Sequence, residues 1–171
     1  LPHSNWVSSV DFSADGTRLL TTDFGGARAD RSDAAWRVWA VPSGEPVTPP
    51  MTGTTSQFNF GLFSPDGRLV FICDNSGAQM WDWAAGQKVG QKIPGISQGT
   101  AVRFSPDGTW FLSVGRSDRT ARIWEVPSGA LRRKFDFAGG ISLSRDGRRL
   151  LGAWPDGSVR LVDTGTGQPL M

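Results

Sequence analysis

The stretch Arg103-Phe-Ser-Pro-Asp-Gly108 decides the fold, because close copies of it occur three more times along the chain. The other copies are Asp11-Phe-Ser-Ala-Asp-Gly16, Leu62-Phe-Ser-Pro-Asp-Gly67 and Ser142-Leu-Ser-Arg-Asp-Gly147. The last three of the four are spaced by 41 and 39 residues. A period between about 20 and 50 residues is typical of repeat architectures, in which each copy is one supersecondary unit. We therefore expect four copies of one structural unit.

A second marker recurs with stricter spacing. Tryptophan ends a short segment in three of the copies, valine takes its place in the fourth, and a glycine lies five residues after each. The pairs are Trp39 with Gly44, Trp81 with Gly86, Trp124 with Gly129, and Val162 with Gly167. Glycine at a fixed offset indicates a tight turn. Because the tryptophans recur at the repeat period, we expect them to have a structural role.

Each unit is predicted to contain four short strands. Val102 and Phe104 alternate with polar neighbours, which is the period of a strand with one buried face. The Asp-Gly turn ends this strand, and a second strand is expected over 18–23, 69–74, 110–115 and 149–154. The third strand contains the tryptophan, and a short fourth strand is expected near Val47, Val89, Leu131 and Leu170. No window has the sustained period of a helix, so we predict an all-β chain of four-stranded antiparallel meanders.

Small sheets with two apolar faces must pack on one another, and a radial array of such sheets is a β-propeller. We expect one propeller segment over 1–171, with blades at 3–50, 51–93, 94–136 and 137–171. Four blades of a larger ring would leave one face of blade one and one face of blade four exposed to water. Two alternatives remain open. Either a homodimer closes an eight-bladed ring through blades one and four, or the chain is a fragment of a longer polypeptide.

Composition excludes several classes of protein. The chain has 171 residues with one cysteine, Cys73, and one histidine, His3, so it cannot form an internal disulfide or a site with paired imidazoles. We expect no metal and no cofactor. The 18 basic and 16 acidic residues are nearly balanced, which argues against nucleic acid binding. No apolar run approaches the ~18 residues of a membrane span. We expect a soluble, cytoplasmic chain and, since it begins at Leu1, a processed or excised piece.

The repeats resemble those of the WD-repeat propeller family. Trp81-Asp82 is the dipeptide that ends the third strand in that family, and the other copies have Trp39-Ala40, Trp124-Glu125 and Val162-Asp163. The segment from His3 to Ser13 is similar to the opening segment of the family's unit, and the resemblance extends over the whole chain. The phrases at 42–50 and 166–170 look like those of bacterial members. The resemblance implies a WD-type β-propeller and a non-catalytic scaffold that binds proteins or peptides.

The resemblance also implies a hydrogen-bonded set of His, hydroxyl, Asp and Trp within a blade. The candidates for this set are His3, Thr21, Trp39 and Asp33 in the first repeat, and Ser113, Asp118 and Trp124 in the third. Gln98 or Gly99 stands where the third repeat would have its histidine. The alternative for His3 is an exposed side chain near a terminus.

In the family, the loops that lead into strand one and those that join strands two and three lie on one recognition face. The resemblance implies that this face contains Trp6, Gln57, Gln98 and Phe137, and the strand-two ends Asp23, Asp74, Gly115 with Arg116, and Trp154. Exposed Trp and Arg there would be natural hot spots. For Phe137 we favour burial between blades, and for Trp6 and Trp154 packing is an equal alternative.

The first repeat is longer than the others because of a polar insertion at 24–35. Arg28 and Arg31 within it are candidates for binding an acidic partner, although we favour a solvated loop.

Three functions compete with the scaffold. An enzyme would need several carboxylates or imidazoles that converge on the central funnel of the propeller. The chain has one histidine, and its acidic residues lie mostly in turns, which argues against an enzyme. A polyanion-binding protein is disfavoured by the balanced charge. The segment could also lack an activity of its own, as part of a larger signalling protein.

Overall fold

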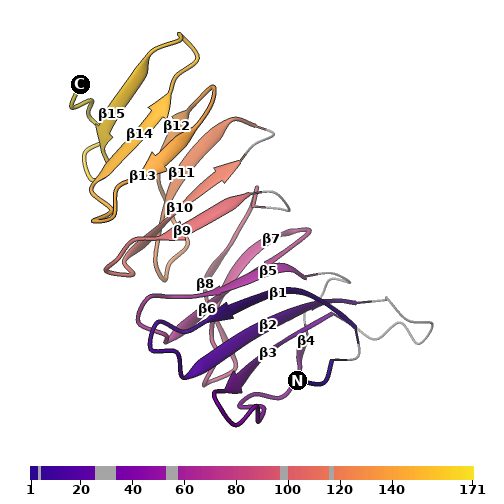
Figure 1. The fold of residues 1–171 in the computed structure, drawn as a ribbon. Helices are drawn as coiled ribbons and strands as arrows, with labels where there is room; N and C mark the ends of the chain where they lie inside the picture. Colours follow the sequence, from indigo (N-terminus) through magenta and orange to yellow (C-terminus); the bar gives the residue numbers. More distant parts are fainter. Residues whose placement is uncertain (4, 26–33, 53–57, 97–99, 116–117) are drawn as a thin grey trace. The chain divides into compact units, whose positions relative to one another are not determined.

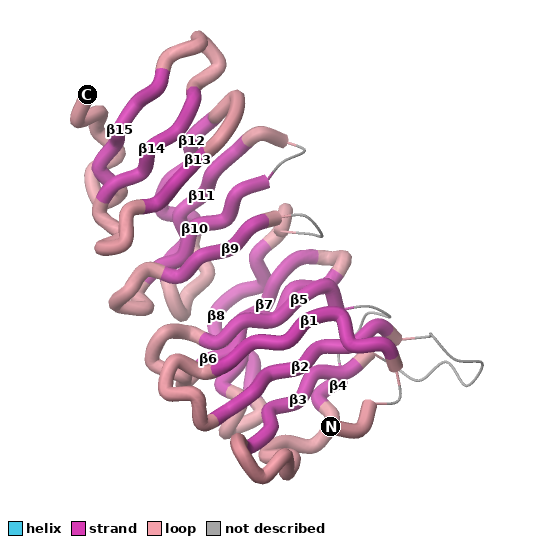
Figure 2. Tube along the Cα trace, in the orientation of Figure 1, coloured by secondary structure: helices cyan, strands magenta, loops and turns pink. Residues whose placement is uncertain are grey.

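The computed structural model of this chain describes residues 1–3, 5–25, 34–52, 58–96, 100–115 and 118–171. Every regular element within these residues is a β-strand, as Figure 2 shows. The prediction of an all-β chain is therefore confirmed.

The strands form four antiparallel sheets, each made of strands that are consecutive in the sequence (Figure 1). The first sheet contains β1 (Trp6–Phe12), β2 (Arg18–Phe24), β3 (Ala35–Ala40) and β4 (Met51–Thr52). The second contains β5 (Phe58–Phe63), β6 (Leu69–Asp74), β7 (Gly77–Asp82) and β8 (Gln87–Ile93). The third contains β9 (Ala101–Phe104), β10 (Trp110–Gly115), β11 (Thr120–Glu125) and β12 (Leu131–Asp136). The fourth contains β13 (Ile141–Leu143), β14 (Arg149–Ala153) and β15 (Val159–Asp163).

The fourth strand is where the sheets differ from the expected pattern. In the first sheet a single bridge joins Trp39 to Pro46, and β4 lies later than expected, in two residues that the sequence assigns to the second blade. In the last sheet a bridge between Val162 and Pro169 replaces the fourth strand, so three strands form where four are predicted. Proline lacks the N–H that a ladder requires, which accounts for both interruptions.

The chain divides into two compact units, and the single propeller segment over 1–171 stays a prediction. The first unit comprises 1–98 and 127–129 and contains the first two sheets. The second comprises 99–126 and 130–171 and contains the other two.

Each unit has its own core between its two sheets. In the first unit, Trp36 and Val38 of β3 are fully buried with Val70 of β6. In the second unit, Ile123 of β11 is buried with Leu150 of β14. These side chains lie on one face of each strand, as the period of two in the sequence predicts.

The four Ser-x-Asp-Gly turns share one hydrogen-bond pattern. The serine hydroxyl donates to the aspartate two residues later at 2.6 to 2.7 Å. The same hydroxyl accepts the N–H of the first residue of the second strand, and the aspartate accepts a further N–H of the turn. The glycine has a φ between 68° and 73°, which L side chains rarely adopt. The repeated motif is therefore a locally closed turn that starts each second strand.

These turns make the stability of the fold sensitive to acid. The hydroxyl of Ser13 lowers the pKa of Asp15 to about 2, and equivalent bonds lower the pKa of Asp107 and Asp146. A carboxylate with a lowered pKa stabilises the folded state above its unfolded pKa of 3.8, and this contribution is lost as the pH falls toward the folded value. We expect the Tm, followed by circular dichroism, to fall between about pH 5 and pH 2.

Asp15→Asn is the matched variant, because it keeps an acceptor in the turn and removes the titration. We expect its Tm to depend less on pH over the same range. Asp11 changes the stability in the opposite direction. Burial raises the pKa of its carboxyl, so protonation of Asp11 favours the folded state in acid. A wild-type Tm that is constant or rises on acidification would contradict the prediction.

Candidate functional site

The hydrogen-bonded set predicted for the first repeat lies around Trp39, whose indole Nε1 donates to Thr21 Oγ1 at 2.8 Å. The His3 ring lies 5.4 Å from the Trp39 ring, and His3 Nδ1 is 3.4 Å from Asp23 Oδ2. The His3 side chain is 8% exposed, so it is not the exposed terminal residue of the alternative interpretation. The carboxylate beside it belongs to Asp23, while the candidate Asp33 lies outside the described residues.

The third repeat has the same indole-to-hydroxyl bond, from Trp124 Nε1 to Ser113 Oγ at 2.8 Å. Asp118 takes no part in it. Asp118 accepts a hydrogen bond from Arg122 at 2.6 Å and from the amide of Thr120 at 3.2 Å, so it holds the β10–β11 hairpin.

The second repeat departs from this pattern. Ile72 stands where the other two repeats have a hydroxyl, so Trp81 has no equivalent hydrogen bond within the described residues. Trp81 instead packs edge to face on Trp36 at 5.5 Å, with the Lys88 ammonium 5.3 Å from its ring centre. Its role is packing within the first unit.

Two carboxylates predicted to contact a partner are used within the fold. Asp23 is buried and accepts the amide of Ala35 at 2.8 Å. Asp74 accepts the amide and hydroxyl of Ser76 at 2.7 and 2.6 Å, and Lys92 lies 3.4 Å away. Burial raises the pKa of Asp74, but these bonds and the charge outweigh it and lower the pKa. The prediction that Asp23 binds a partner is wrong because its carboxylate is inaccessible, and Asp74 chiefly closes its own hairpin.

The two tryptophans proposed for the recognition face differ in exposure. Trp6, at the start of β1, is 76% exposed. Trp154 is half-buried against the core of the second unit, and the Arg160 guanidinium lies 5.6 Å from its ring centre. Trp6 is thus open to a partner, and Trp154 is mainly a packing residue.

The first and last sheets each have an apolar face exposed to water. On the first sheet this face comprises Val7, Val10 and Phe12, with Val10 62% and Phe12 60% exposed. On the last sheet, Leu151 and Val159 are exposed on the face opposite the core. These are the two faces that the repeat count predicts to be uncovered.

Several candidates lie outside the described residues. They are Gln57, Gln98, Arg116, Arg28 and Arg31.

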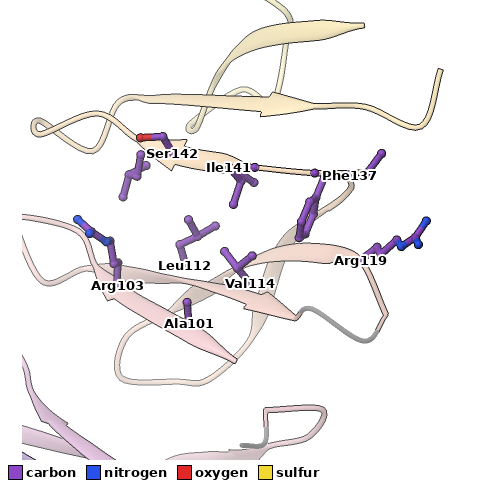
Figure 3. A pocket seen from close by; sticks show the side chains of 12 residues that line it. Ala101, Arg103, Leu112, Val114, Arg119, Phe137, Ile141 and Ser142 are labelled. Carbon is purple, nitrogen blue, oxygen red and sulfur yellow. The ribbon is translucent and has the colours of Figure 1, made fainter. Parts of the chain in front are cut away.

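Phe137 is buried, as favoured, and forms part of the wall of a cavity of about 610 Å³ in the second unit (Figure 3). The cavity lies between β9 and β10 on one side and β13 with the segment before it on the other. Arg103 and Arg119 lie at its two ends, and Leu112 lies between them. Neither arginine is among the site residues predicted from the sequence. The only signal was that arginine replaces, in the third repeat, the aspartate of Asp11-Phe-Ser-Ala-Asp-Gly16.

Among the described residues, no three His, Cys, Asp or Glu side chains are grouped so that they could hold a metal ion. The same part of the chain contains no helix that is long and apolar enough to cross a bilayer.

Comparison with known proteins identifies repeats of one kind. The family model described as "WD domain, G-beta repeat" matches residues 1–39 and 91–125. Elongator complex protein 2 of Schizosaccharomyces pombe is 30% identical over 139 residues, which cover 71% of this chain and 17% of that protein. The small ribosomal subunit protein RACK1 of Caenorhabditis elegans is 26% identical over 93% of this chain and 50% of its own.

Pre-mRNA-processing factor 19 homolog 2 of Arabidopsis thaliana is 30% identical over 94% of this chain and 30% of its own length. The chain thus spans half or less of the length of these relatives. A bacterial origin stays a prediction.

Proposed function

Since this chain belongs to the WD-repeat family, we propose that it is a non-catalytic module that holds protein or peptide partners in a larger assembly. The observation that carries the proposal is the repeat itself, which provides four antiparallel sheets of this family's type. Two of the relatives are named for an assembly to which they belong, the Elongator complex and the small ribosomal subunit. The large exposed ring of Trp6 supports the proposal, because such aromatic side chains dominate binding energy at interfaces.

The absence of catalysis is part of this proposal, and it rests on how the reactive side chains are used. His3, the sole histidine, is held between Trp39 and Asp23, and the Cys73 thiol is buried. The aspartates of the repeated turns are bound by their own serines. We also propose that nucleic acid and membranes are not partners, given a net charge of +2. The cytoplasmic location stays a prediction.

We expect Trp6→Ala to reduce capture of protein partners strongly while leaving the Tm unchanged, because the side chain is exposed and contributes little to the core. The measurement is crosslinking of the tagged, full-length protein in its source cells, followed by quantitative mass spectrometry. Leu131→Ala, which truncates an exposed apolar residue on β12, is the matched control. An identical set of crosslinked proteins for wild type and Trp6→Ala would count against this surface.

We further propose that the exposed apolar faces of the first and last sheets pack against other blades of the same kind. Those blades come from a second copy of the chain or from the rest of a longer polypeptide. An apolar sheet face that is exposed to water favours association with another apolar surface.

Light scattering distinguishes the two sources. For a homodimer we expect about twice the chain mass of 18.4 kDa, and we expect Phe12→Glu to return the mass to that of a monomer. A wild-type monomer whose binding of an apolar dye decreases in Phe12→Glu would favour a longer polypeptide. A monomer with no such change would contradict the proposal for this face.

A further inference from the structure

In the first unit, side chains of β1 form hydrogen bonds to the free edge of β5. Ser9 Oγ accepts the amide of Gly61 at 2.9 Å, and Asp11 Oδ2 accepts the amide of Phe63 at 2.8 Å. Both amides belong to β5 and point away from its partner β6, because alternate residues of an edge strand have no ladder partner. Two side chains of β1 therefore satisfy the free edge of β5.

The second unit lacks this closure. The repeat alignment puts Ala101 at the position of Ser9 and Arg103 at the position of Asp11, so neither acceptor is present on β9. The amides equivalent to those of β5 are Ile141 and Leu143 of β13. The neighbouring Ser144 amide is bonded to Arg149, which directs the amides of Ile141 and Leu143 to the open edge. Within the described residues, no hydrogen bond joins β9 to β13.

The space between these two strands is the cavity of about 610 Å³. Its middle is apolar, since Leu112 and Val114 lie opposite Ile141 and Phe137 (Figure 3). Its ends are basic, because Arg103 and Arg119 are both exposed there, and neither forms an ion pair with any described carboxylate. The cavity thus combines an unpaired strand edge, an apolar floor and two free positive charges.

Besides its unpaired charge, Arg119 has an unusual backbone conformation. Its φ is +52°, and it is the only described non-glycine residue with a positive φ. An L side chain in this region costs about 1 to 2 kcal/mol relative to glycine. Strained residues of this kind cluster at functional sites, where the side chain is worth more than the strain. An arginine at such a position, beside the cavity, is therefore a candidate for a functional side chain.

We propose that this cavity binds an extended acidic peptide, which adds as a strand to the edge of β13 between Arg103 and Arg119. The proposal rests on the proposed function and names a binding surface and a class of partner for it. The peptide backbone pairs with Ile141 and Leu143, its alternate apolar side chains face Leu112 and Val114, and its carboxylates pair with the two arginines. Strand addition uses main-chain bonds for affinity and pockets for alternate side chains for specificity.

The probe is a capped, fluorescein-labelled peptide Glu-Ile-Thr-Ile-Glu, titrated with the full chain and followed by fluorescence anisotropy. We expect saturable binding, and weaker binding of the peptide in which lysine replaces both glutamates. N-methylation should abolish binding at one set of alternate residues and be tolerated at the other, because only alternate amides of an added strand pair with β13. Equal binding of the lysine peptide, or indifference to N-methylation at every position, would overturn the proposal.

Two variants of the chain test the geometry. Ala101→Ser combined with Arg103→Asp restores the acceptors of the first unit, so it should close the edge and weaken binding at least tenfold. Arg119→Gly removes one charge and relieves the positive φ, so it should weaken binding about fivefold while the Tm rises. Arg145→Gln, an exposed arginine of a turn outside the cavity, is the matched control and should bind as wild type.

Failure of this proposal is distinguishable from failure of the proposed function. If the folded wild-type chain does not bind the probe but Trp6→Ala still reduces partner capture, the cavity proposal falls and the protein-binding role stands. Unchanged affinity in both the closing variant and Arg119→Gly would also overturn the proposal.

Discussion

Trp36→Ala is expected to destabilise the first unit by about 3 to 5 kcal/mol, the range observed when a buried tryptophan or phenylalanine is truncated. Trp36 has no exposed surface and lies in the core between the first two sheets, in edge contact with Trp81. A loss of this size is a large fraction of the stability of an ordinary domain. Chemical denaturation followed by tryptophan fluorescence and circular dichroism measures it.

Trp36→Phe is the informative companion variant. The indole N–H of Trp36 is buried without a hydrogen-bond partner among the described residues. Phenylalanine keeps most of the ring and removes this unsatisfied donor, so we expect a much smaller loss than for alanine. Equal losses of unfolding free energy for Trp36→Phe and Trp36→Ala would contradict this expectation. The exposed Leu131→Ala should change stability by less than about 0.5 kcal/mol.

Gly90→Ala is expected to have the second large effect, above about 3 kcal/mol. Gly90 lies in β8 with a φ of +69°, and an added Cβ would overlap the carbonyl oxygen of Pro127 and lie 2.7 Å from that of Ser128. Backbone oxygens cannot move aside as the end of a side chain can. The variant should therefore break the bond from the Gln91 amide to Ser128, which is 2.9 Å long.

Gly95→Ala is the matched control for this variant. Gly95 has a similar φ of +74°, but an added Cβ would meet no atom within 4 Å. It should cost only the conformational penalty of about 1 kcal/mol. Thermal denaturation gives the difference between the two, and faster hydrogen exchange at Gln91 in Gly90→Ala would locate its origin. Equal losses of stability would show that the contact with Pro127 is unimportant.

The parts of the fold that the sequence predicts well are those made by neighbouring residues. Each Ser-x-Asp-Gly turn is closed by bonds between residues two to five positions apart, so the motif is sufficient to place the turn and the strand after it. The bond from Trp39 to Thr21 follows from the register of one hairpin, and the family resemblance is enough to suggest it.

Predictions of the recognition face were less successful. Whether a strand-end residue meets solvent depends on what packs against it, and Asp23 is buried by contacts with His3 and Ala35 that its position in the repeat does not reveal. The fourth strands were misplaced for a related reason. They pair last in each meander, and Pro46 and Pro169 interrupt the ladder where the repeat pattern suggests a strand.

From its sequence alone, this chain specifies four antiparallel units, their turns and the tryptophans that recur in them, because these depend on local hydrogen bonds and on a period of two. Only the tertiary structure decided which sheet edges are closed and which are open. Ser9 and Asp11 satisfy amides 52 residues away in the chain, and the open edge of β13 exists because the third repeat brings an alanine and an arginine to those positions. Such pairings between sheets join residues far apart in the sequence, so the pattern within a single repeat does not reveal them.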